Sequence, residues 1–121
     1  MNILMIAVLS ILFSVGAQFS LKAGMSSIEV KDILGAPMTL GTALSVLTNR
    51  YVLGGFVLYG MGAVIWLAVL SKWDVSKAYP LVGLGFVFTV AAGYALGEQV
   101  STMRAIGTLL ICCGVFLVAR S

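Results

Sequence analysis

The chain has 121 residues, of which 61% are hydrophobic and only 9% are charged, and its formal net charge at pH 7 is +3. A water-soluble domain of this size leaves much of its surface in water and usually has about 25% charged residues. The composition therefore excludes a water-soluble monomer and indicates a protein that lies mostly within a membrane.

The first apolar run extends from Ile3 to Leu21 and contains no Lys, Arg, Asp or Glu. A membrane-spanning helix needs about 20 mostly apolar residues, so we expect a transmembrane helix over residues 3–22. The alternative is a cleavable signal peptide, because Val15 to Ala17 is similar to a cleavage site. No positive charge precedes the run and apolar sequence continues past Ala17, so we expect a retained helix.

Polar side chains recur at every fourth residue along this first run, and they are Ser10, Ser14, Gln18 and Lys22. This spacing places them on one slowly drifting stripe of a helix. Polar groups in lipid are unfavourable unless they face protein or a wet cavity, so the stripe should point inward. Alternatively, the serines bond back to their own helix and Lys22 extends to the interface. Gln18 and Lys22 are candidates for lining a transport pathway.

A connection of 30 residues, Lys22 to Tyr51, follows the first run and is the longest polar stretch of the chain. Its second part begins at Pro37 and spaces leucines at helical intervals. These leucines are Leu40, Leu44 and Leu47. We therefore expect an interfacial segment over residues 25–49 that includes a short amphipathic helix.

Three more apolar runs complete the chain: Val52–Leu70, Ala78–Leu96 and Ala105–Ala119. They predict transmembrane helices over residues 51–71, 77–97 and 103–119. The links between these helices are short, so consecutive helices should be antiparallel neighbours. We expect one all-α membrane domain over residues 1–121, with four transmembrane helices.

The second run combines small and aromatic residues. Gly55 and Tyr59 are four residues apart, as are Gly62 and Trp66, so each pair shares one helix face. Small residues allow close helix packing in lipid, which explains the glycines. Aromatic faces also stack on sugar rings, so Tyr59 and Trp66 are candidate binding residues.

Glycines punctuate the last two runs, namely Gly83, Gly85, Gly93, Gly97, Gly107 and Gly114. Gly93 and Gly97 have the G-x-x-x-G spacing, and Gly107 and Gly114 are seven residues apart, so both pairs suit helix packing. The adjacent Cys112 and Cys113 point about 100° apart on a helix and are expected to be packing residues rather than a disulfide or metal ligands.

The positive charges barely specify an orientation. Three lie on the side of the termini (Lys72, Lys77 and Arg120), and four lie on the other side (Lys22, Lys31, Arg50 and Arg104). Such a small bias is compatible with two copies inserted in opposite senses, or with a partner that fixes the sense. We expect a dimer and leave its symmetry open.

The acidic residues are Glu29, Asp32, Asp74 and Glu98, all near the ends of the spans, and the chain has no histidine. Hydrolytic or metal chemistry thus has few candidate residues. We expect no enzyme, no metal ion, no cofactor and no nucleic-acid partner. A proton-coupled exporter generally needs a carboxylate within the bilayer, and none is evident here.

Four stretches carry a resemblance to a known family: Ser14–Lys22, Gly62–Leu70, Val75–Leu81 and Gly97–Val118. The chain resembles the drug/metabolite transporter (EamA-like) superfamily at its four-helix, small-multidrug-resistance-like end. Multidrug exporters of that superfamily typically have a glutamate midway along the first helix and a tryptophan soon after an Ala-Tyr pair. This chain has Gln18 and, after Tyr79, Pro80, which disfavours drug antiport.

Within that superfamily, the chain is similar to the paired small subunits that flip 4-amino-4-deoxy-L-arabinose-phosphoundecaprenol across the bacterial inner membrane. The shared features are the spaced Gln and Lys of the first helix, Trp-Leu in the second, Ala-Tyr-Pro, and a Glu that opens the last loop. This resemblance implies a multi-pass inner-membrane flippase for a polyprenyl-phosphate-linked (amino)sugar, acting as a homodimer or with a related small membrane protein.

Under this hypothesis, Lys22 and Arg104 attract the phosphate, Gln18 bonds polar groups, and the aromatic residues Tyr59, Trp66 and Tyr79 contact the sugar. Glu98 either pairs with Arg104 or contacts an amino group of the cargo. Pro80 starts or loosens the third helix, and Gly83 and Gly85 leave space for a neighbour or a bend. The alternatives are a small-multidrug-type exporter of hydrophobic cations and a non-transporting accessory subunit of a related transporter.

Overall fold

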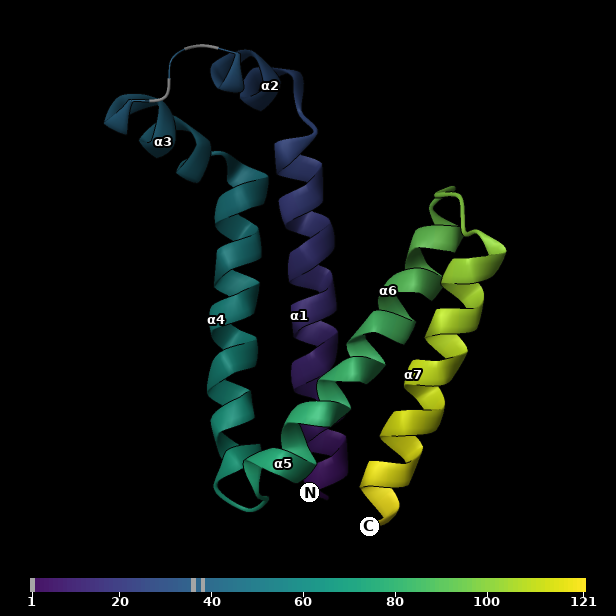
Figure 1. The fold of residues 1–121 in the computed structure, drawn as a ribbon. Coiled ribbons are helices and arrows are strands. Elements are labelled where there is room, and N and C mark those ends of the chain that lie inside the picture. Colours follow the sequence, from purple (N-terminus) through teal and green to yellow (C-terminus); the bar gives the residue numbers. More distant parts are fainter. Residues whose placement is uncertain (1, 36, 38) are drawn as a thin grey trace.

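The computed structural model describes residues 2–35, 37 and 39–121, and within them all regular structure is helical. Four helical stretches are long and apolar enough to cross a membrane, which confirms the four predicted transmembrane helices. They are α1 (Ile3–Met25), α4 (Arg50–Leu70), the composite stretch Val75–Ala95 and α7 (Thr102–Arg120). Figure 1 shows both termini at the same end of the bundle.

Two short helices occupy the connection between α1 and α4, at the end opposite the termini (Figure 1). These are α2 (Ile28–Leu34) and α3 (Leu40–Leu47). A capping box starts α3, because Thr39 and Thr42 bond each other's main-chain N–H groups. The leucines of α3, Leu40, Leu44 and Leu47, are exposed in this chain. Helix α3 itself lies near the end of α4 that is away from the termini (Figure 1).

The third span is built from three pieces: α5 (Val75–Ala78), the 3-10 turn η1 (Tyr79–Val82) and α6 (Gly83–Ala95). Pro80 lies in η1, where its missing N–H removes one helical hydrogen bond and the helix tightens. At the other end, Gly97 has a φ of +93°, a left-handed conformation that ends α6. The span is therefore irregular at its start and ends in a fixed turn.

Helices α1 and α4 pack closely along their length because small residues lie between them. A Cβ atom at Gly62 would lie 3.2 Å from the main-chain oxygen of Ser10, and one at Gly55 would lie 3.1 Å from that of Ala17. The Ser10 hydroxyl donates a hydrogen bond to the Gly62 oxygen over 2.6 Å, and the Ser20 hydroxyl donates to the Tyr51 oxygen over 2.6 Å. Small residues and interhelical hydrogen bonds are the usual means of joining helices in lipid.

Helix α6 lies between α1 and α7, and two of its glycines face opposite sides. A Cβ at Gly85 would lie 3.2 Å from Ile11 of α1, whereas one at Gly83 would lie 3.0 Å from Val115 of α7. These contacts belong to the apolar core at the end of the bundle that bears the termini. The buried core residues are Ala7, Ile11, Val15, Val69, Ala78, Leu81 and Val115. From there α6 diverges from α1 towards the other end (Figure 1).

The outer face of α7 is the least covered part of the bundle. A Cβ at Gly107 or Gly114 would meet no described atom within 4 Å. A packing role for these two glycines therefore needs a neighbouring molecule, and the dimer expected from the sequence stays a prediction.

Candidate functional site

A groove of about 510 Å³ lies between α1, α4 and the third span. Helix α1 contributes Ser10, Ile11, Ser14, Val15 and Gln18, and α4 contributes Tyr59, Gly62, Ala63 and Trp66. The third span contributes Tyr79, Val82, Gly85, Phe86 and Thr89. On each helix these residues, single or in adjacent pairs, recur every three or four positions, so each set lies on one side of its helix.

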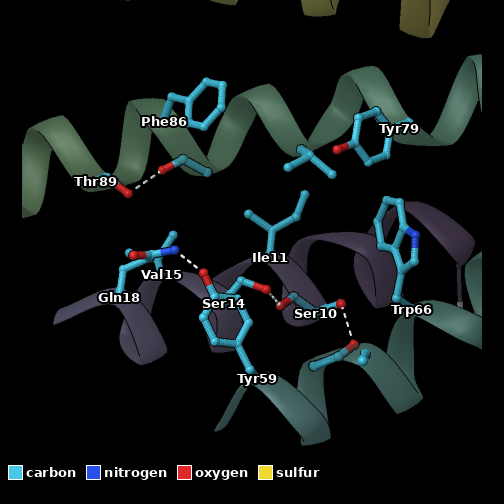
Figure 2. A pocket seen from close by; sticks show the side chains of 14 residues that line it. Ser10, Ile11, Ser14, Val15, Gln18, Tyr59, Trp66, Tyr79, Phe86 and Thr89 are labelled. Atoms are coloured by element: carbon cyan, nitrogen blue, oxygen red, sulfur yellow. Dashed lines mark hydrogen bonds between the residues drawn. The ribbon is translucent and has the colours of Figure 1, made fainter. Parts of the chain in front are cut away.

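The groove has a polar end and an aromatic end (Figure 2). Gln18 and Thr89 lie at the polar end, and Trp66 and Tyr79 lie at the other. Tyr79 is 66% exposed, so the aromatic end opens towards the surroundings of the bundle, which in a membrane are lipid. None of the described lining residues carries a formal charge.

Hydrogen bonds hold the polar side chains in place. The amide nitrogen of Gln18 donates to the hydroxyl of Tyr59, which joins α1 to α4 across the groove. The Ser14 and Thr89 hydroxyls donate to main-chain oxygens one turn earlier in their own helices, over 3.3 and 2.7 Å. A hydroxyl that donates in this way keeps acceptor lone pairs, and Gln18 keeps its amide oxygen. The polar end is thus suited to accept hydrogen bonds from a ligand's hydroxyl or amine groups.

The structure brings together four of the residues selected from the sequence: Gln18, Tyr59, Trp66 and Tyr79. It also places Ser10 and Ser14 in the lining, as the inward stripe predicts. Ser10, Ser14 and Gln18 are four residues apart on one continuous helix, so all three lie on the face of α1 that lines the groove.

The three charged candidates lie outside the lining. Lys22 is exposed in the last turn of α1. Arg104 donates from its guanidinium to the main-chain oxygen of Gln99 over 2.8 Å, and within the described residues it forms no ion pair with Glu98. Glu98 follows the end of α6.

Phe86 and Thr89 line the groove but were not among the residues selected from the sequence. Thr89 lies four residues after Gly85 within α6, so helical spacing from that glycine identifies Thr89. Phe86 lies seven residues after Tyr79, but Tyr79 belongs to η1, where the periodicity of one continuous α-helix does not apply, so spacing alone does not connect this pair.

Removing the bond between Gln18 and Tyr59 is expected to loosen the groove. Tyr59→Phe and Gln18→Met should each lower the free energy of unfolding in detergent, and the double variant should lose less than the sum. A coupling of about 0.5–1.5 kcal/mol is expected for one neutral hydrogen bond. Tyr94→Phe is the matched control, because Tyr94 is 72% exposed and lies away from the groove. If the losses of the two single variants add up to the loss of the double variant, the bond does not contribute to stability.

A family model described as "Putative transmembrane family 234" matches residues 6–119, almost the whole chain. The chain belongs to this family. Membership of a transmembrane family agrees with the four membrane-spanning helices, and the matched residues include all the residues that line the groove.

Curated relatives of this family 234 chain include transporter subunits. A "Probable 4-amino-4-deoxy-L-arabinose-phosphoundecaprenol flippase subunit ArnE" of Pseudomonas savastanoi pv. phaseolicola is 35% identical over 83 residues, which are 68% of this chain and 73% of the relative. A protein of the same name from Pseudomonas syringae pv. syringae is 44% identical over 62 residues, 50% of this chain and 57% of the relative. The "Uncharacterized protein y4nH" of Sinorhizobium fredii is 36% identical over 86 residues, 69% of this chain and 73% of the relative.

These relatives show that the family 234 chain is a small multi-pass membrane protein of the drug/metabolite transporter type. The relatives named as flippase subunits are transporters and not enzymes. The chain spans little more than half the length of several of them. No solved structure is significantly similar to this one.

Proposed function

We propose that the chain is a flippase subunit that moves a polyprenyl-phosphate-linked amino sugar across the inner membrane. The observation that carries the proposal is the uncharged groove with one polar and one aromatic end. The names of the relatives support the same class of cargo.

The groove fits the physical problem of moving such a lipid. Sugar hydroxyls and a phosphate are unfavourable in hydrocarbon, whereas a polyprenyl tail is at home there. A groove that opens sideways to lipid shelters the polar headgroup and leaves the tail outside. The exposed Tyr79 and Phe86 mark this opening, because each lines the groove and also faces outward.

The residues at the two ends of the groove have different roles under this proposal. Gln18, Tyr59 and Thr89 exchange hydrogen bonds with the sugar hydroxyls at the polar end. Trp66 and Tyr79 lie against the sugar ring or the first tail units. Lys22 receives the phosphate, because it lies one helical turn beyond Gln18 and is exposed.

A partner is part of the proposal. The chain works with a second copy or with a related small membrane protein, since the names of the relatives describe subunits. The uncovered face of α7, with Gly107 and Gly114, is available for that contact. Arg104 lies at the start of α7 and, in such an assembly, adds a second cation for the phosphate.

Transport of a labelled lipid-linked amino sugar in reconstituted vesicles tests the proposal. The chain is assayed alone and after co-expression with a related small subunit, and we expect transport in at least one of these arms. The double variant Gln18→Ala with Lys22→Ala should reduce transport at least about tenfold, since it removes one neutral and one charged hydrogen bond. Lys72→Ala, an exposed lysine at the other end of the bundle, should leave the rate unchanged.

Three outcomes would contradict the proposal. Full activity of the double variant would exclude the assigned site. Absence of transport in both arms would favour a non-transporting accessory subunit. Transport of hydrophobic cations in place of the lipid would favour a drug exporter. Mass spectrometry of co-purifying lipid gives an independent check, because a bound polyprenyl phosphate is expected.

A further inference from the structure

Two charged side chains lie about one helical turn beyond the polar end of the groove, outside its lining. On α1, Lys22 lies one turn beyond Gln18 on the groove-facing side of the helix. On α6, Gly93 lies one turn beyond Thr89, and its position falls on the same face as the lining residues Val82, Gly85 and Thr89. A side chain that packs against Gly93 therefore lies next to the polar end of the groove.

The side chain of Glu98 packs against Gly93. A Cβ atom on Gly93 would overlap the carboxylate of Glu98 and would lie 3.2 Å from its Cδ. Gly93 is buried, although Glu98 itself is exposed. The absence of a side chain at Gly93 is therefore what allows the Glu98 carboxylate to lie against α6.

The turn after α6 fixes the direction in which Glu98 leaves the helix. The N–H of Glu98 donates to the oxygen of Gly93 over 2.9 Å, and the N–H of Gly97 donates to the oxygen of Tyr94 over 3.1 Å. With Gly97 in a left-handed conformation, these bonds form a Schellman motif. The backbone thus folds back after α6 and places Glu98 against the last turn of that helix.

This position is electrostatically unfavourable for a carboxylate within the chain alone. The C-terminal end of a helix carries a partial negative charge, which repels an anion there. In the described part of the chain no ion pair compensates Glu98, because Arg104 donates to Gln99 instead. A carboxylate held in this place by its local structure is suited to receive a cation from outside the chain.

Lys22 belongs to α1 and Glu98 to the turn after α6, and these two helices diverge towards this end of the bundle (Figure 1). We propose that Glu98 is the residue that recognises the protonated amine of the cargo, separately from the phosphate contact at Lys22, and that it thereby selects the amino form of the sugar. Gly93 is a positioning residue for Glu98. The inference rests on the proposed function and adds the residue that recognises the amine.

The test compares two probes in the same vesicles, with any subunit that transport requires. The probes are a polyprenyl-phosphate-linked amino sugar and the same lipid with its amine acetylated. The wild-type chain should move the amino form about tenfold faster, the effect of one hydrogen bond between charged groups. Glu98→Gln should slow the amino form to the rate of the acetylated form, Glu98→Asp should retain part of the preference, and Lys22→Gln should slow both forms alike.

Gly93→Ala tests the positioning role. Its methyl group displaces the flexible end of Glu98 without touching main chain, so the helix should fold while the preference for the amino form falls. Gly60→Ala is the matched control, since a Cβ at Gly60 meets no described atom within 4 Å. The preference of that control should equal that of the wild type.

The outcomes separate this inference from the proposed function. Equal wild-type rates for the two lipids would overturn the role of Glu98 and leave the flippase proposal standing. Transport of neither lipid would overturn both. If Glu98→Gln slowed both lipids to the same extent, the carboxylate would have a structural role and the inference would be wrong.

Discussion

Gly62→Leu is expected to lower the free energy of unfolding in detergent by about 1–3 kcal/mol, the usual effect of overpacking, and to abolish transport. The first added carbon would lie 3.2 Å from the main-chain oxygen of Ser10 and 3.3 Å from the Cβ of Phe13. Neither atom moves unless α1 itself moves. Separation of the helices would also break the bond from Ser10 to Gly62, and one wall of the groove would shift.

Gly60→Leu provides the matched control, because Gly60 is only two residues away on α4 and faces outward with no described neighbour within 4 Å. Both variants remove one glycine from the same helix, so any difference between them reports the contact with α1. Denaturant titration followed by circular dichroism measures the decrease in the free energy of unfolding. Equal stability of the two variants would show that the α1–α4 contact does not limit stability.

Gln18→Glu is expected to reduce transport at least about tenfold while the protein stays folded, because the new carboxylate would pair with Lys22, one helical turn away, and withdraw that lysine from the phosphate of the cargo. No described residue of the groove lining is charged, and Gln18 donates its amide hydrogen to Tyr59. An ionised carboxylate cannot donate that bond, and it repels the phosphate of the cargo. The rate is measured with the same labelled lipid in vesicles.

Gln18→Met separates the charge from the hydrogen bond. Methionine has a similar length, remains neutral and cannot bond Tyr59. The transport rate should therefore fall several-fold less in this variant than in the glutamate variant. If the two variants lose the same activity, the hydrogen bond alone is responsible and the neutrality of the groove is unimportant.

The spans and the polar stripe could be predicted because both depend on local sequence. About 20 apolar residues require a spanning helix, and four-residue spacing places Ser10, Ser14 and Gln18 on one face wherever that helix packs. The inward-facing position of this stripe could therefore be predicted without knowing which helices pack against α1. Tyr59 and Trp66 were found for the same reason, through their spacing with glycines on α4.

The features that sequence reasoning missed depend on neighbours. The sequence indicated that Gly83 and Gly85 serve packing or bending, but only the arrangement of three helices shows that they face different partners. Similarly, the spacing of Gly93 and Gly97 indicated a helix seam. In the structure Gly97 forms a left-handed turn and Gly93 accommodates Glu98, because α6 ends before that spacing is complete.

The close packing of α1 against α4 has a consequence for biosynthesis. The contacts that join the two helices, from Ser10 with Gly62 to Ser20 with Tyr51, all lie before Leu70. They need nothing from the second half of the chain, so this hairpin can close in the membrane while the ribosome is still translating α6. Helix α6 then docks on a finished surface, through the contact of Gly85 with Ile11. The groove is thus completed only late in synthesis, when its third wall arrives.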